Sequence, residues 1–390
     1  MRWPLASTVA IAVALVAPAA AAQVVASAPP AGDDLPSGNE TPRFVPIAVV
    51  DTYYAYHDTP PPGREATLST TAIRHNEFNL NLVSLGGTLQ HAKLLGTIIL
   101  QAGTSVDALY PSNPALGRSS NTETWKHIQV ATVGYRITQN LDFEAGVFPS
   151  HIGHETFVST ANWNYTRSML ADSTPYFLAG AKGTWRASPK LTLTALVYNG
   201  WQTYYDVNRY KKGALMLQWR PTETLSLSDS ISIGPEVLDH QQVRYFNDFI
   251  VTWAPHPRLA FAGEFAAGLD HRPNKADGQT DPKYWAADIC ARWNIGDTTY
   301  FALRGERIVD DSGILTFTGA RVDAQAGSGQ RLMGGTFTIG FLPHPKLLAR
   351  VEASHRVADR DFFAGGSGNG GVPGVRSDTT TFVASMAFSY

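Results

Sequence analysis

The chain alternates apolar and polar residues with a period of two from Ile47 to its C-terminus. A period of two places successive side chains on opposite faces of a β-strand, and the alternating segments are about 8 to 14 residues long. Seven short connections and eight long polar connections take turns along the chain, and together they join sixteen segments. This pattern predicts an all-β fold of antiparallel strands linked as hairpins.

The connections fall into two classes by length. The short ones lie near residue 90 and at 138–140, 188–190, 221–224, 255–258, 296–298 and 343–346. The long ones lie near 58–75, 103–125, 149–175, 201–211, 234–242, 269–282, 309–330 and 358–377. Because consecutive strands run in opposite directions, all short connections are expected at one end of the sheet and all long ones at the other.

The composition of the polar face separates a membrane barrel from a soluble sandwich. In one strand Leu141 and Phe143 share one face, while Asp142 and Glu144 share the other. Charged residues make up only 16% of the chain, against roughly 25% in soluble proteins. The polar faces hold Gly, Ser, Thr and isolated charges where a soluble sheet would carry dense Lys and Glu. We therefore predict a transmembrane antiparallel up-and-down β-barrel of about 16 strands over residues 46–390.

One strand departs from this rule. Asp229 shares the apolar face of its strand with Leu227 and Ile231, so its carboxylate would meet lipid. A bulge in the strand or a neighbouring subunit that covers this face would each explain the exception, and the sequence leaves both open.

The N-terminus predicts export from the cytoplasm. Residues 1–22 combine Arg2, a short apolar run and a small-residue cleavage site, as in a secretory signal peptide. Residues 23–45 are rich in Pro, Gly, Ala and Asp and predict a flexible periplasmic leader. No later apolar stretch reaches the length of about 18 residues that a membrane-spanning helix needs. The net charge of −2 gives no electrostatic basis for binding nucleic acid.

Aromatic residues near the short turns predict contact with outer-membrane lipid. Rings with an apolar body and a polar edge suit the interface between membrane and water. The predicted interfacial girdle comprises Tyr135, Trp185, Trp219, Trp253, Trp293 and Phe341. Ordinary core aromatics in soluble hairpins are the alternative.

The last segment alternates up to the terminal Tyr390. A barrel closes only when its last strand pairs with its first, so the chain is expected to end within a strand. A terminal aromatic strand also resembles the recognition signal of bacterial outer-membrane barrels, which implies the barrel-assembly machinery as a partner.

A segment near the middle of the chain resembles a known family. Residues 146–202, which begin GVFPSHIGHETF, are closely similar to the OmpL-like family of β-barrel porins. DTYYAYH at 51–57, NEFNLNL at 76–82 and LQAGTSVDALY at 100–110 resemble the family's first strands, so the resemblance covers most of residues 47–235. It implies a channel in the bacterial cell outer membrane for small hydrophilic solutes or ions, and it does not imply a particular solute.

The long connection at 149–175 is the candidate constriction of the pore. By analogy with sixteen-stranded porins, in which the third external loop folds inward, this loop is expected to narrow the lumen. The candidate residues are His151, His154, Glu155, Tyr165, Arg167 and Asp172. The alternative is that the loop packs at the mouth and has only a structural role.

Charged residues on the polar faces are candidates for pore lining. The acidic ones are Asp51, Asp142, Glu144, Asp248, Glu264, Asp288, Glu306 and Glu352. The basic ones are Arg136, Lys182, Arg186, Arg220, Arg292, Arg304, Arg350 and Arg356. An Arg or Lys that faces lipid costs about 2 to 4 kcal/mol at the membrane midplane, so these side chains are expected to face water. Because the two signs balance, weak ion selectivity is predicted.

No catalytic, metal or cofactor site is predicted. The segment SHIGHE contains His151, His154 and Glu155, but it matches no zinc motif and supplies no third ligand. No spacing supports a Ser-His-acid hydrolase, and Cys290 is expected to be an inert thiol in the lumen. A barrel that binds partners through its long loops, with a blocked lumen, is the alternative function, and an enzyme built on a barrel is the third. The oligomeric state stays open, with a homotrimer as one option.

Overall fold

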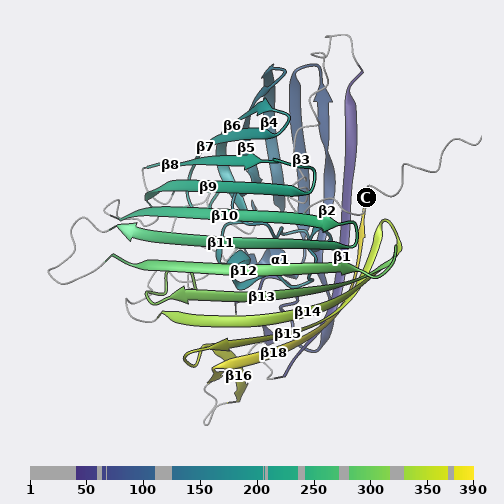
Figure 1. Ribbon diagram of the computed structural model, residues 1–390, viewed down its shortest axis with the longest axis vertical. Coiled ribbons are helices and arrows are strands. Elements are labelled where there is room, and N and C mark those ends of the chain that lie inside the picture. Colours follow the sequence, from purple (N-terminus) through teal and green to yellow (C-terminus); the bar gives the residue numbers. More distant parts are fainter. Residues whose placement is uncertain are drawn as a thin grey trace, which may run out of the picture.

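The computed structural model describes residues 41–58, 64–66, 68–109, 125–204, 206, 210–235, 242–271, 281–316, 329–367 and 373–390. Within them, sixteen strands form one closed antiparallel barrel (Figure 1). The predicted signal peptide at 1–22 and most of the predicted leader at 23–45 lie outside the described residues. The first strand begins at Arg43, inside the segment predicted as leader.

The barrel strands are, in chain order, β1 (Arg43–His57), β2 (Glu77–His91), β3 (Leu94–Ala102), β4 (Ile128–Thr138), β5 (Leu141–Pro149), β6 (Phe177–Ser188), β7 (Leu191–Tyr198), β8 (Lys212–Trp219), β9 (Leu225–Pro235), β10 (Val243–His256), β11 (Leu259–His271), β12 (Lys283–Asn294), β13 (Thr299–Asp310), β14 (Gln330–His344), β15 (Leu347–Ala358) and β18 (Asp378–Ser389). The last long connection holds a separate hairpin of β16 (Phe363–Ser367) and β17 (Pro373–Arg376). The helical segments are α1 (Thr104–Leu109), η6 (Ser159–Ala161) and α3 (Met169–Ser173). None of the helices in the described part of the chain is long and apolar enough to cross a membrane.

The last strand closes the ring, as predicted. Phe388 of β18 lies opposite Val50 of β1 on one side and opposite Leu347 of β15 on the other. In Figure 1 the purple first strand and the yellow last strand meet at this seam. Closure gives every barrel strand two hydrogen-bonded neighbours, so the barrel has no free edge.

The two faces of the strands have the predicted environments. On β11, Phe265 is 46% exposed on the exterior, whereas its neighbour Glu264 is 3% exposed inside the barrel. The six aromatic residues of the predicted girdle are all 45 to 56% exposed. Trp253 stacks on Phe261 of the next strand with ring centroids 5.8 Å apart.

Asp229 keeps its outward position without a bulge. β9 pairs with β8 and with β10 in continuous register through this residue. Asn247 of β10 donates from its side chain to the Asp229 carboxylate at 2.7 Å. The exception is therefore a polar pair on an apolar exterior, and only a covering neighbour remains of the two explanations.

Candidate functional site

The connection between β5 and β6 crosses the barrel interior and contacts the opposite side of the barrel, formed by β10–β15 and called the far wall below. The Gly153 N–H donates to Asp248 of β10 (2.9 Å), and the His154 N–H donates to Glu264 of β11 (3.0 Å). The His154 Nε2 atom lies 2.7 Å from Asp288 of β12. Gly153 has a φ of +92°, which favours glycine, and this conformation presents its N–H to the wall.

Arg304 of β13 holds two parts of the loop at once. Its guanidinium donates to Glu155 Oε1 (2.9 Å), to the carbonyl of Thr166 (2.6 Å) and to the carbonyl of Arg167 (3.1 Å). The Arg304 side chain is fully buried. Because a guanidinium carries five N–H donors in a fixed plane, one buried arginine can satisfy several backbone carbonyls that water no longer reaches.

Two residues of β15 bind the tip of the loop. Arg350 donates to the carbonyl of Ser159 (2.7 Å), and Glu352 accepts from the N–H groups of Tyr165 (2.5 Å) and Thr166 (2.9 Å). Arg350 and Glu352 are two positions apart on one strand, so both side chains face the lumen.

The helix α3 begins against a wall carboxylate. Ser168 is its N-cap and accepts from the Ala171 N–H (3.0 Å), while Glu306 of β13 accepts from the Met169 N–H (2.5 Å). The first N–H groups of a helix have no partner within it and favour a nearby negative charge. Arg356 of β15 lies 3.2 Å from Glu306 and forms an ion pair with it.

Asp51 of β1 joins the first strands to the loop. Its carboxylate accepts from Ser159 Oγ (2.7 Å) and from the Tyr165 hydroxyl (3.2 Å). A β-bulge beside Asp51 turns Asn81 of β2 inward, and the Asn81 amide donates to the same carboxylate at 2.8 Å. This carboxylate is therefore satisfied although Asp51 is fully buried.

Arg167 and Asp172 bind the end of the loop to Tyr176 and to Thr70 of the connection between β1 and β2. The Arg167 guanidinium lies over the Tyr176 ring, 3.6 Å from its centroid, and Asp172 accepts from the hydroxyls of Thr70 (2.6 Å) and Tyr176 (2.9 Å). Burial raises the pKa of Asp172 to about 6, although the nearby Arg167 lowers it.

The two loop histidines differ in charge. Burial lowers the pKa of His151 to about 3, so its imidazole is neutral. Burial also lowers the pKa of His154, but the adjacent Asp288 outweighs it and the pKa rises to about 10. Of the two, only His154 is protonated on both ring nitrogens and positively charged at neutral pH.

On the wall formed by β4–β7, Glu144, Lys182 and Arg186 keep some contact with water, whereas Arg136 and Asp142 are buried. Lys182 and Glu144 form an ion pair at 2.9 Å, and their side chains are 16% and 14% exposed. Asp142 pairs with Arg136 at 3.0 Å and with Arg186 at 2.8 Å. The side chains that the loop covers on the far wall are almost completely buried.

Two of the predicted wall residues lie toward the short-turn end. Arg292 is half-buried, and its guanidinium lies 4.0 Å from the centroid of the Tyr300 ring. Arg220 is exposed and follows β8 in the short connection to β9, so it belongs to the rim of the barrel and not to its wall.

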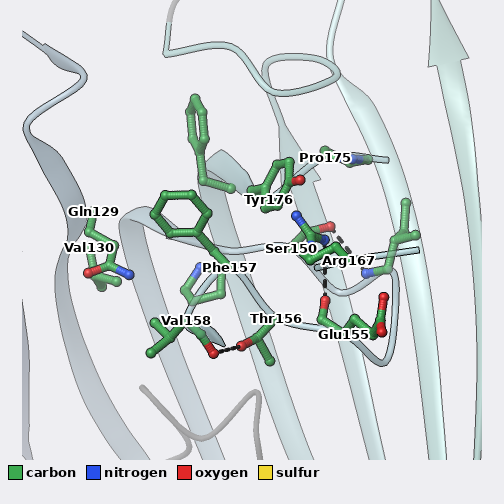
Figure 2. Close-up of a pocket in the computed structure, with 13 residues that line it drawn as sticks. Gln129, Val130, Ser150, Glu155, Thr156, Phe157, Val158, Arg167, Pro175 and Tyr176 are labelled. Atoms are coloured by element: carbon green, nitrogen blue, oxygen red, sulfur yellow. Dashed lines mark hydrogen bonds between the residues drawn. The ribbon is translucent and has the colours of Figure 1, made fainter. Parts of the chain in front are cut away.

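A pocket of about 60 Å³ lies between the loop and the near wall. Figure 2 shows Gln129 and Val130 of β4 at one end of the lining, Glu155 with Arg167 at the other, and Phe157 of the loop between them. The loop thus packs closely against the far wall and leaves space beside β4.

The lumen also contains a pair that was not singled out from the sequence. Arg244 of β10 binds Asp270 of β11 through two nitrogens, at 2.8 Å and 3.0 Å. Both residues share the parity of Asp248 and Glu264 on the same strands, so the alternation rule would have found them.

The model of the family described as "Putative beta-barrel porin-2, OmpL-like" matches residues 47–390. No curated protein matches the sequence. Among solved structures, the anion-selective porin from Comamonas acidovorans has a TM-score of 0.55 at 10% identity, with 90% of this chain and 100% of that chain covered.

Two further solved structures have the same fold. The outer membrane channel DcaP of Acinetobacter baumannii gives a TM-score of 0.55 at 10% identity, over 90% of this chain and 97% of that chain. The trimer form of OmpT from Vibrio cholerae gives 0.56 at 9% identity, over 90% and 100%. Such low identities show the fold alone, whereas the family match spans the barrel from end to end. The chain therefore belongs to the OmpL-like β-barrel porin family and is an outer-membrane porin.

Proposed function

We propose that the barrel passes small hydrophilic solutes or ions by passive diffusion and that the loop at 149–175 narrows its bore. The division of the lumen supports this proposal. The loop covers the wall of β10–β15 with buried hydrogen bonds, whereas Glu144, Lys182 and Arg186 on the other side remain partly exposed. The passage is accordingly assigned to the side of β4–β7.

The charges along that passage favour weak ion selectivity. Lys182 is paired with Glu144, and Arg186 is paired with Asp142. A ring of one sign sets a strong preference for the opposite ion, and a wall of paired charges does not. The proposed pore-lining residues of the far wall act mainly by holding the loop.

Planar-bilayer recording of the refolded full-length barrel tests the channel. Stepwise openings with a linear current–voltage relation are expected. A correctly folded barrel that inserts into the bilayer and carries no current would refute the proposal. It would favour the alternative, a barrel with a blocked lumen that binds partners through its long loops.

The proposed partners follow from the exterior of the barrel. The exposed aromatic girdle is proposed to contact outer-membrane lipid, and β18 with its terminal Tyr390 is proposed to be recognised by the barrel-assembly machinery. A homotrimer is proposed because a neighbour would cover Asp229 and Asn247, and a trimer form is recorded for the structurally similar OmpT. Residues 1–22 are proposed as a signal peptide and 23–45 as a leader, and no catalysis is proposed.

A further inference from the structure

Four residues with metal-binding side chains meet where the loop touches β11 and β12. The ligand atoms of His154, Asp288 and Cys290 all lie within 4.8 Å of one another. His154 Nε2 is 2.7 Å from Asp288 Oδ1 and 3.8 Å from Glu264 Oε2, and Cys290 Sγ is 3.9 Å from Asp288 Oδ1. All of these side chains are buried.

These separations are close to those of a zinc site. With Zn–N and Zn–O bonds of about 2.0 to 2.2 Å and a Zn–S bond of about 2.3 Å, the ligand atoms of a tetrahedral site lie about 3.2 to 3.7 Å apart. The measured distances of 2.7, 3.8 and 3.9 Å lie on both sides of that range. The ligand atoms of His154, Asp288 and Cys290 therefore lie near three positions of a tetrahedral site, and Glu264 beside His154 is the nearest candidate for the fourth.

Three buried carboxylates around this cluster favour the binding of a cation. Asp248, Glu264 and Asp288 come from three adjacent strands, and Glu264 lies directly opposite Asp288 in the sheet. One oxygen of each carboxylate is buried and accepts no hydrogen bond from the described residues. The His154 imidazole lies against Asp288, and Arg304, which lies opposite Cys290 in the sheet, is already engaged with Glu155. Buried carboxylate oxygens without partners are costly, and a bound cation would reduce that cost.

We propose that His154, Asp288, Cys290 and Glu264 bind one divalent transition-metal ion of the Zn²⁺ class. An imidazole, a thiolate and carboxylates together select such an ion over Mg²⁺ or Ca²⁺, which bind oxygen ligands. On binding, the Cys290 thiol releases its proton, and the metal replaces the proton that His154 shares with Asp288. The ion would fix the start of the loop to β11 and β12. The site is additional to the proposed channel activity.

The test uses the refolded full-length barrel, stripped with EDTA, kept reduced and titrated with Co²⁺ and with Zn²⁺. One equivalent of metal per barrel is expected, and the cobalt form should show a thiolate-to-metal charge-transfer band. Cys290 is the single cysteine of the chain, so Cys290→Ser should abolish that band. Zinc affinity should fall at least about tenfold in Cys290→Ser and in His154→Gln.

His151→Gln is the matched control, because His151 is a buried histidine of the same segment that does not belong to this cluster. It should bind metal as the native chain does, and Mg²⁺ should not compete. Failure of the native barrel to bind Co²⁺ or Zn²⁺ would overturn the proposal, as would a zinc affinity in Cys290→Ser and His154→Gln equal to that of the native barrel. If His154→Gln does not fold, the comparison of zinc affinity and of the cobalt band between the native chain and Cys290→Ser still tests the proposal. Conductance measured in EDTA tests the channel separately.

Discussion

Arg304 and Glu155 form a buried ion pair across the lumen, with the guanidinium 2.9 Å from the carboxylate, and so join β13 to a loop that leaves the barrel at β5. Replacing Arg304 by Met leaves Glu155 buried without the cation that pairs with it, whereas Glu306 keeps its ion pair with Arg356. Removing one partner of a buried pair costs about 3 to 5 kcal/mol. We expect a loss of that order in the free energy of unfolding, measured by urea denaturation in detergent micelles.

Arg331→Met is the control for this variant. Arg331 pairs with Asp311 at 2.8 Å, but both side chains are more than half exposed. Exposed pairs are screened by water and contribute little, so a small change in the free energy of unfolding is expected. Equal effects of the two substitutions would contradict the role assigned to Arg304.

Shortening the loop tests its effect on the bore. Residues 156–170 are replaced by a short Gly-Ser linker, which removes the segment held by Arg350 and Glu352. We expect a clear rise in single-channel conductance, because the far wall then faces water. In a second variant, residues 156–170 are replaced by Gly and Ser at the native length. This variant keeps the length of the loop but removes the side chains that bind it to the wall, so the two effects on conductance can be compared. Unchanged conductance in the short variant would exclude a constriction.

The open side of the lumen should control ion preference. Lys182→Gln with Arg186→Gln removes two positive charges and leaves Glu144 and Asp142 in place. A shift toward cation selectivity is expected in the reversal potential measured across a KCl gradient. Arg307→Gln on the same barrel is the control, because Arg307 is exposed on the outer face of β13. An equal shift of the reversal potential in the two variants would contradict a passage along β4–β7.

The pH dependence of stability should contain a contribution from Asp172. Its pKa is raised by burial from 3.8 to about 6 in the folded chain, so the folded protein keeps this proton where the unfolded chain has lost it. Stability from this group is complete below pH 3.8 and is lost as the pH rises through 6. In Asp172→Asn the decline between these values should be smaller. Asp107→Asn, at an exposed position on α1, should leave the decline as it is in the native chain.

Lipids brominated near the headgroup should quench the girdle tryptophans. Trp293 is 56% exposed on the exterior, whereas Trp163 packs inside the barrel beside Tyr300. Trp293→Phe should therefore reduce the quenchable share of the fluorescence, and Trp163→Phe should not. If Trp163→Phe reduced the quenchable share and Trp293→Phe did not, the girdle would not lie at the lipid interface.

The alternation of residues was sufficient to predict the strands and their closure. Side-chain parity placed Glu264, Asp288 and Cys290 inside the barrel because a strand has only two faces. The same rule failed at β2, where Leu82 and Val83 are successive apolar residues and a bulge directs Asn81 inward. The break in the pattern was visible, but a bulge is one of several ways to produce it.

The partners of the loop could not be predicted. Glu352 and Tyr165 are 187 residues apart in the chain, and nothing local relates one to the other. The sequence motif SHIGHE offered two histidines and a glutamate, and the side chains that complete the cluster around His154 come from β11 and β12. Such pairings depend on which strands face each other across the ring, and strand periodicity does not contain that information.

The path of the loop has a consequence for biogenesis. Gly153 precedes Asp248, Glu264 and Arg304 in the chain, so a barrel that has paired only its N-terminal strands holds a loop without its partners. Docking of that segment therefore requires the C-terminal strands and accompanies closure of the ring. A truncated or incompletely closed barrel would expose unpaired ionic groups at its centre, a state that periplasmic proteases could distinguish from the finished porin.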